Sequence, residues 1–106
     1  MKKFDEKIVK IIKKLCKPFA IYIFGSYAEG RSTKRSDIDV AALFPDDKIP
    51  GEMKRISIQN EVSDELELEC DFVVLNMAGP ILCMQVLKKG KLIYCENDNA
   101  LAKFKI

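Results

Sequence analysis

The sequence has no histidine, no C-x-x-C pair and no long uninterrupted apolar run. Without histidine, the chain cannot use the Ser-His or Cys-His pairs that activate many catalytic nucleophiles, so proton transfer must rely on carboxylate, lysine, tyrosine or water. The spacing of the cysteines does not resemble that of a zinc site. We expect four small buried thiols in a reducing compartment, namely Cys16, Cys70, Cys83 and Cys95.

Signals for membrane insertion and secretion are also missing. No apolar stretch approaches the roughly 18 residues that a membrane-spanning helix requires, and lysines interrupt residues 1–17, where a secretory signal would be apolar. The formal net charge of +2 is too small to require nucleic acid as a partner. We therefore expect one domain over residues 1–106, located in the cytoplasm and without membrane contact.

Helical and strand patterns alternate along the chain. Apolar spacing predicts three helices, over residues 5–16, 51–66 and 79–89. Short apolar segments predict four strands, over residues 20–24, 38–44, 70–75 and 91–95. Such alternation predicts an α+β fold, with a mixed β-sheet and flanking helices. The first strand is continuously apolar and is expected at the centre of the sheet, and the last is expected at an edge.

The three helices carry specific expectations of their own. Asp5 is expected to be the N-cap of the first helix. Pro80 is expected near the start of the third helix, and Gly90 as its C-cap. In the second helix the apolar face is expected to consist of Met53, Ile56, Val62 and Leu66.

Two aspartates stand at the start of the second strand, although aspartate is disfavoured in strands. Asp37 and Asp39 project from one face, with Ile38 turned into the core, because successive side chains alternate. Two carboxylates so close repel each other unless a cation lies between them. Mg²⁺ takes one or two carboxylates and completes its shell with waters and substrate phosphates. The pair predicts a Mg²⁺ or Mn²⁺ site suited to displacement at phosphorus.

A third acid, Asp71, begins the third strand. If that strand lies beside the second, Asp71 approaches Asp39 across the ladder and becomes a third ligand. The alternative is a strand-capping acid in an acidic segment, with no part in metal binding.

A Gly-Ser pair, Gly25 and Ser26, follows the first strand and precedes Asp37 by ten intervening residues. Glycine permits a turn in which the backbone approaches a ligand closely. The Ser26 hydroxyl and nearby backbone N–H groups can form an anion cradle. The alternative is an ordinary Gly-Ser turn, but the acid pair that follows makes a phosphate site the more specific interpretation.

These residues resemble a known family. The segments G-S-x-A-x-G (25–30) and S-D-I-D (36–39) resemble the nucleotidyltransferase superfamily of the DNA polymerase β type, whose signature is G-S, ten residues, then D-x-D. The later segment "LNMAGPILCMQVLKKGKLIY" is similar to the minimal, or MNT-type, nucleotidyltransferases. The resemblance covers roughly residues 20–95 and implies the nucleotidyltransferase, polymerase β palm-like, fold.

The resemblance implies an enzyme, a Mg²⁺-dependent nucleotidyltransferase that uses ATP as nucleotide donor. Asp37, Asp39 and Asp71 would be its catalytic residues. Asp37 and Asp39 would hold two Mg²⁺ ions, or Mn²⁺ ions, and Asp71 would complete one of the two sites.

The nucleotide phosphates would lie on Gly25 and Ser26. Many relatives carry arginine where this chain has Glu29. Two outcomes are open: the missing arginine weakens phosphate binding, or Arg31 substitutes for it from the next turn.

Relatives that modify tRNA, aminoglycosides or DNA carry further domains for the acceptor, and we expect none here. Free-standing minimal members often pair with an all-helical HEPN protein as the antitoxin of a toxin–antitoxin system. The resemblance then implies transfer of AMP from ATP to a tyrosine of the HEPN RNase toxin. Two alternatives are a transferase for a small hydroxylated acceptor with a helper subunit, and a non-catalytic antitoxin that neutralises its partner by binding.

One apolar segment is a candidate docking surface for such a partner. The alternative is a helix face that packs on the sheet. Its residues are Ile81, Leu82, Met84, Val86 and Leu87.

Overall fold

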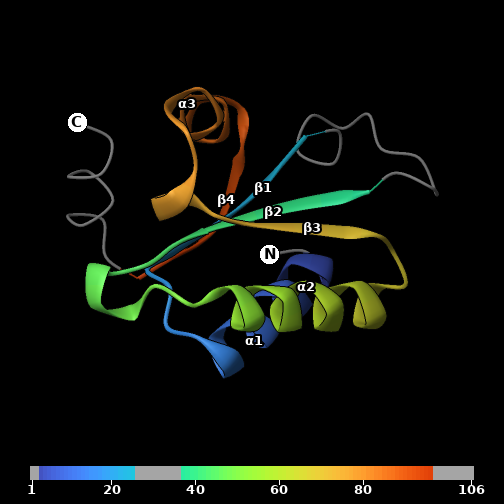
Figure 1. The fold of residues 1–106 in the computed structure, drawn as a ribbon. Coiled ribbons are helices and arrows are strands. Elements are labelled where there is room, and N and C mark those ends of the chain that lie inside the picture. The colour runs from blue at the N-terminus through green and yellow to red at the C-terminus, as the bar shows by residue number, and fades with distance from the viewer. Residues whose placement is uncertain (1–2, 26–36, 97–106) are drawn as a thin grey trace.

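Three helices and a four-stranded sheet make up the regular structure of the computed structural model, which describes residues 3–25 and 37–96 (Figure 1). The helices are α1 (Lys3–Leu15), α2 (Glu52–Leu66) and α3 (Pro80–Lys89), and two short 3₁₀ turns, η1 (Asp46–Lys48) and η2 (Leu75–Met77), join elements. The strands are β1 (Ala20–Phe24), β2 (Ile38–Leu43), β3 (Cys70–Val74) and β4 (Lys91–Cys95). The predicted α+β fold is confirmed.

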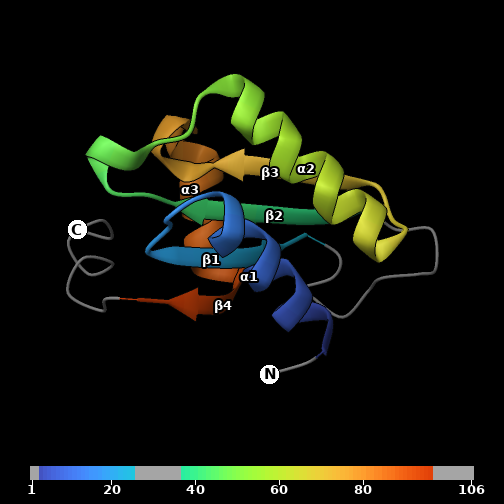
Figure 2. The same cartoon turned by 90° about the horizontal axis from the view of Figure 1, so that it is seen from below.

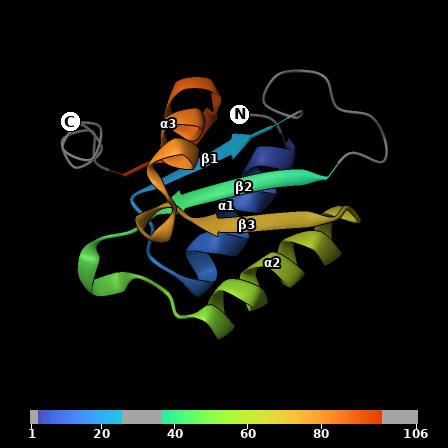
Figure 3. The ribbon, with the colours of Figure 1, turned by 45° about the horizontal axis from the view of Figure 1, so that its top comes forward.

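The strands follow the order β3-β2-β1-β4. β1 pairs antiparallel with both β2 and β4, whereas β2 and β3 run parallel, so the sheet is mixed. β1 is a central strand, as its continuous apolar sequence predicts, and β4 is an edge strand. As a result β1 ends at the same end of the sheet at which β2 and β3 begin (Figure 3).

Helices cover the two faces of the sheet unequally. α1 and α2 cover one face (Figure 2), where Ile8, Ile12, Ile58 and Val62 are buried against Phe72 and its neighbours. α3 covers the other face, where its Val86 packs in a smaller core with sheet residues. α3 stands over the end of the sheet at which β2 and β3 finish (Figure 1). The last turns of α3 reach the other end of the sheet, where Gln85 and Lys89 line a hollow with Phe24 and Gly25.

The N-cap prediction for Asp5 is wrong. α1 begins before this residue, and Asp5 lies inside the first turn, where it is 4% exposed. Its carboxylate accepts a hydrogen bond from Lys91 Nζ at 2.9 Å. Asp5 therefore links α1 to β4 instead of capping a helix.

The predicted apolar face of α2 is correct only in its second half. Met53 is 84% exposed and Ile56 is 41% exposed, whereas Ile58 and Val62 are fully buried. The side of α2 that faces the sheet is polar near its N-terminus, because Arg55 and Gln59 reach the backbone of β3 there. Apolar spacing cannot identify a sheet-facing turn that is polar.

The predicted positions of Pro80 and Gly90 at the two ends of α3 are confirmed. Pro80 occupies the first turn. The N–H of Gly90 donates to the carbonyl of Val86 at 2.8 Å, and its φ of −73° shows that this C-cap is extended and not left-handed.

The expected burial of the cysteines is correct for Cys70, whereas Cys16, Cys83 and Cys95 are half-buried at the margins of the two cores. Within residues 3–25 and 37–96, the helices are too short or too polar to cross a bilayer.

Candidate functional site at the end of the sheet

The candidate residues come from three adjacent strands that meet at one end of the sheet. Gly25 follows the last residue of β1, Asp37 immediately precedes β2, and Asp39 and Asp71 are the second residues of β2 and β3. Ser26 and Arg31, together with Glu29, lie outside the described residues.

The strand register places Asp39 at the centre of this group. Asp39 is the Cα partner of Asp71 in the parallel β2–β3 ladder and of Phe24 in the antiparallel β1–β2 ladder. The strand pairing that the role of Asp71 requires is therefore present. Ile38 is fully buried in the core under α1 and α2, as predicted. Asp39, the next residue of β2, therefore faces the opposite side of the sheet.

The environment of Asp39 disfavours its negative charge. The side chain is half-buried, whereas Asp37 and Asp71 are exposed. Desolvation raises the pKa of Asp39, and the charges of Asp71 and Asp37 raise it further. Burial, aided by Asp71 and Asp39, also raises the pKa of Cys70 to about 12. Cys70 is therefore a neutral thiol at neutral pH, and the donors of the site are carboxylate oxygens.

Gly25 has a conformation that other residues rarely adopt. Its φ is +75°, in the left-handed region that favours glycine. A Cβ atom at this position would collide with Oδ2 of Asp39. The chain therefore leaves β1 with its backbone directly against the carboxylate, and a side chain at this position would strain the backbone and displace the carboxylate.

The donor set of the site suits a hard divalent cation. In the described part of the chain, no three acidic or thiol side chains already converge as a metal cluster. The aspartates are neighbours on two strands and not a closed ligand set. Their oxygens are the ligands that Mg²⁺ and Mn²⁺ prefer, and a cation would relieve the like-charge repulsion at Asp39. The residues present therefore fit such an ion.

A small hollow adjoins Gly25 on the β1 side of the acids. It has a volume of about 240 Å³ and is lined by Phe24, Gly25, Gln85 and Lys89. Lys89 brings a positive charge to the glycine turn. Sequence reasoning missed Gln85 and Lys89, because in the sequence "QVLKKG" they belong only to the end of a helix.

A larger cavity adjoins Asp71 on the β3 side. Its volume is about 530 Å³. Its lining comes from the start of α2, from β3 and from the segment that leads into α3. Its lining includes Ile49, Pro50, Asp71, Met77, Ala78 and Leu82.

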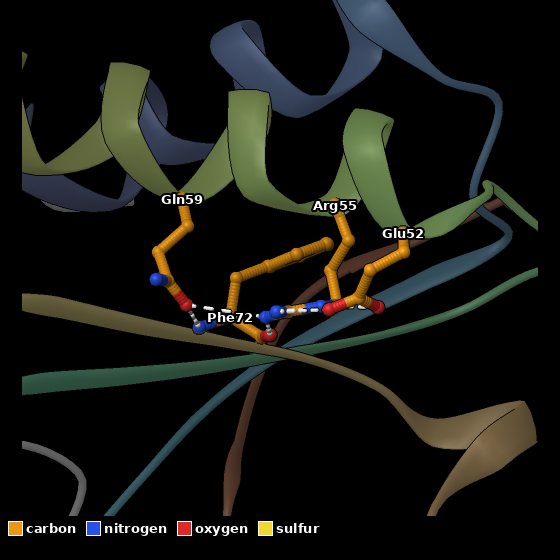
Figure 4. A network of polar contacts seen from close by, with 4 residues as sticks. All are labelled: Glu52, Arg55, Gln59 and Phe72. Atoms are coloured by element: carbon orange, nitrogen blue, oxygen red, sulfur yellow. Dashed lines mark hydrogen bonds and ion pairs between the residues drawn. The ribbon is translucent and has the colours of Figure 1, made fainter.

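Two polar side chains of α2 hold β3 beside this cavity (Figure 4). Gln59 Oε1 accepts the backbone N–H of Phe72 at 2.9 Å, and Arg55 donates to the Phe72 carbonyl at 3.0 Å. Glu52 accepts two hydrogen bonds from the guanidinium, at 2.6 and 3.0 Å. This pairing raises the pKa of Arg55, to which the charge of Asp71 also contributes. No apolar or catalytic motif in the sequence points to Arg55 or Gln59.

A mixed sheet with a glycine turn and three aspartates at one end is the architecture of a nucleotidyltransferase of the polymerase β type. The chain belongs to the family described as "Polymerase beta, Nucleotidyltransferase", whose sequence model matches residues 6–99. The resemblance read from the sequence is thus confirmed.

Three similar proteins extend this comparison. The "Protein adenylyltransferase MntA" of Shewanella oneidensis is 33% identical over 91 residues, which is 85% of this chain. The chain spans 64% of that protein's length. A crystal structure of a toxin–antitoxin with AMP-PNP matches with a TM-score of 0.86 and 30% identity, over 94% of this chain and 79% of that one. A structure of the tri-AMPylated HEPN toxin of Shewanella oneidensis in complex with MNT antitoxin matches with a TM-score of 0.77 and 30% identity, over 96% and 79%.

Proposed function

We propose that this protein is a Mg²⁺-dependent protein adenylyltransferase, an antitoxin that transfers AMP from ATP to a tyrosine of a HEPN-domain toxin. The observation that carries the proposal is the register of the sheet. It sets Asp39 beside Asp71 and beside the glycine turn of Gly25. The names of the similar proteins supply the acceptor: one is a protein adenylyltransferase, and another is an MNT antitoxin in complex with an AMPylated HEPN toxin.

In the proposed reaction the tyrosine hydroxyl oxygen attacks the α-phosphorus of ATP. A bond forms between these two atoms, the bond from the α-phosphorus to the bridging oxygen breaks, and pyrophosphate leaves. Asp71 orients the hydroxyl and accepts its proton, directly or through water. Gly25, Ser26 and Arg31 hold the phosphates, and Lys89 adds a positive charge beside them.

Asp37 and Asp39 would hold two Mg²⁺ ions, and Asp71 would complete one site. The bound ions supply charge stabilisation for the transferred phosphoryl group and the departing pyrophosphate. The protein itself contributes mainly position: β2 and β3 fix the acids, and the glycine turn after β1 fixes the phosphates relative to them. We place this reaction in the cytoplasm, where ATP is abundant, in keeping with the free thiols of Cys16, Cys70 and Cys83.

The proposal is tested by co-expressing the chain with the HEPN-domain protein of the same genome. The purified pair is incubated with Mg²⁺ and ATP, and intact-mass and peptide mass spectrometry locate AMP on the HEPN protein. We expect AMP on a tyrosine with the wild-type chain, far less with Asp39→Asn, and none with excess EDTA. Absence of the adduct with the wild-type chain, or as much adduct with Asp39→Asn as with the wild type, would overturn the proposal.

A further inference from the structure

We propose that a further cavity, at the end of the sheet opposite the aspartates, binds a free nucleoside phosphate through lysine side chains instead of metal ions. This inference is independent of the proposed function, because it concerns residues that take no part in the transfer of AMP. The cavity has a volume of about 450 Å³. We call it the lysine cavity, and its lining includes Lys13, Lys17, Lys48, Tyr94 and Glu96.

The lysine cavity is remote from the aspartates. It is lined by Lys17, which follows α1, by Pro45, which follows β2, and by Tyr94 near the end of β4. The arrowheads of β2 and β4 both point to this end of the sheet in Figure 2. β2 has six residues and is therefore roughly 20 Å long. A ligand in the lysine cavity is thus separated from Asp39 by about the length of a strand.

The lysines around this cavity come from separate elements. Lys13 lies in the last turn of α1, Lys17 follows that helix, and Lys48 belongs to η1. Burial raises the pKa of the Cys16 thiol in the lining, and the charge of Lys54 on α2 partly offsets the rise, so a fourth ammonium group is near. The dipole of α1 favours lysines at its C-terminal end but does not account for those on η1 and α2. Ammonium groups gathered around one cavity repel each other, and a bound anion would relieve that repulsion.

The charges of these lysines are not used by the ion pairs that join the helices. Two other lysines of α1 pair with glutamates of α2, at 2.7 and 3.7 Å. Within residues 3–25 and 37–96, Lys13, Lys17 and Lys48 form no such pair with a carboxylate. Lys13 Nζ lies instead over the ring of Tyr94, 4.6 Å from its centre. Three positive charges therefore line the cavity against the single carboxylate of Glu96.

The lining offers a partner for each part of a nucleoside phosphate. Lysine ammonium groups bind phosphate as point charges. The carboxylate of Glu96 can accept hydrogen bonds from ribose hydroxyls, which an inorganic phosphate lacks. Pro18, Pro45 and the ring of Tyr94 provide apolar surface for a base. The volume of about 450 Å³ is within the range of roughly 300–1,000 Å³ typical of small-molecule sites, so the cavity suits a free nucleotide better than a nucleic acid strand.

Binding is tested in EDTA, because the lysine cavity needs no divalent ion to hold phosphates. ADP is titrated into the isotope-labelled protein while the backbone amide resonances are followed by NMR. We expect saturable shifts at Lys17, Lys48 and Tyr94, which weaken in high salt because ions screen partly exposed charges. The absence of shifts, or shifts confined to the surroundings of Gly25 and Asp39, would overturn the inference.

A charge reversal locates the site. Lys48→Glu should weaken ADP binding in EDTA about tenfold or more, because an attractive charge in the lining becomes repulsive. Lys88→Glu is the matched control: it changes the net charge equally, and Lys88 is an exposed residue of α3 outside the lysine cavity. Equal losses of affinity in the two variants would show general attraction to a basic protein and contradict the inference. If Lys48→Glu does not fold by circular dichroism, Lys17→Glu is judged by the same comparison.

Inorganic pyrophosphate and a short single-stranded oligonucleotide identify the ligand class. ADP should bind about tenfold or more tightly than pyrophosphate, the effect of one hydrogen bond to a charged group together with contacts of the base. Glu96→Gln should bring the two affinities closer, because it removes a charge that repels both ligands and an acceptor that only the ribose uses. Equal affinity of the wild type for ADP and pyrophosphate, or tighter binding of the oligonucleotide than of ADP, would overturn the assignment to a free nucleotide.

Discussion

At the scale of single residues, burial and the charges of neighbouring acids both disfavour the ionised form of Asp39. Its neighbours Asp71 and Asp37 add to the desolvation that raises its pKa. A group in this state lowers the stability of the metal-free protein when it is ionised. The same group is suited to bind a cation, because the cation removes the cause of the unfavourable energy. Stability and catalysis should therefore respond in opposite directions when Asp39 is neutralised.

The variant Asp39→Asn should reduce AMP transfer by roughly 100-fold or more, because it weakens charge stabilisation worth several kcal/mol. Metal-free Asp39→Asn should nevertheless be as stable as the wild type at pH 7, or more stable by at most about 1 kcal/mol, because solvent screens the charge of a half-buried group. Thermal melting in EDTA measures the second effect, and the transfer assay measures the first.

The difference in stability between metal-free Asp39→Asn and the wild type should depend on pH, because the pKa of Asp39 is raised. Because the pKa of Asp39 is raised, the folded state binds its proton more tightly than the unfolded state does. The stability it contributes is complete below its ordinary pKa of 3.8 and is lost as the pH rises through the folded-state pKa. The advantage of Asp39→Asn should accordingly appear above that pKa and vanish near pH 3.8. An advantage that grows toward low pH would contradict this assignment.

Gly25 is the second residue whose identity the site requires. Gly25→Ala should lower the free energy of unfolding by about 1–3 kcal/mol, because alanine must adopt a positive φ. It should also reduce transfer, since the new Cβ displaces the Asp39 carboxylate. Gly79→Ala is the control, because Gly79 has a negative φ and open space around it. Urea unfolding measures the free energy of unfolding of both variants. Equal losses of stability would exclude a special role for Gly25.

At the scale of secondary-structure elements, the edge strand β3 depends on α2. β3 pairs with β2 on one side only, and on the other side the backbone of Phe72 bonds to Gln59 and Arg55. Since Asp71 precedes Phe72, these two contacts fix the strand at the position that carries the third acid. α2 thus positions the site without contributing a ligand to it.

The variant Gln59→Leu should lower the free energy of unfolding by about 1–3 kcal/mol, because the partly buried N–H of Phe72 loses its acceptor. Hydrogen exchange of the Phe72 amide should accelerate relative to other amides of β3. Asn60→Leu is the control on the exposed side of the same helix and should stay within about 0.5 kcal/mol of the wild type. A loss of stability no larger than that of the control would show that the contact does not hold the strand.

The elements themselves could be predicted from the sequence because their signals are local. The apolar run of β1 and the turn signals around it place that strand correctly, and β2, β3 and β4 begin where expected. The sequence alone does not specify that Asp39 and Asp71 are adjacent. Their adjacency depends on parallel pairing between two strands that are far apart in the chain.

Other parts of the site have no local signal. Arg55 and Gln59 are polar helix residues at a spacing that also suits a solvated face, and their partner is a backbone group, which no side-chain pattern specifies. Met53 and Ile56 show the converse, because they continue the apolar pattern yet lie exposed. Lys89 lies beside Gly25 only because the fold brings the end of α3 to the end of β1, a contact that the local sequence does not indicate.

At the scale of the whole molecule, one ion pair joins the start of the described chain to its last strand. Asp5 on α1 is 4% exposed and binds Lys91, the first residue of β4, whose side chain is 46% exposed. β4 pairs with β1, the strand that ends at Gly25. The pair therefore fastens α1 to the edge of the sheet opposite β3 and stabilises the layer beneath the site without touching the acids.

Lys91→Met should lower the free energy of unfolding by about 1–3 kcal/mol, because the buried Asp5 carboxylate loses its partner; the value is below that of a fully buried pair because Lys91 is half-exposed. Adding Asp5→Asn to this variant should restore part of the loss, since no unpaired charge then remains. A double-mutant cycle in urea measures the coupling. Strict additivity of the two substitutions would contradict an energetic link between α1 and β4. Transfer activity should remain near that of the wild type below the unfolding transition, because the pair supports the sheet as a whole and contacts neither the glycine turn nor the cavity beside Asp71.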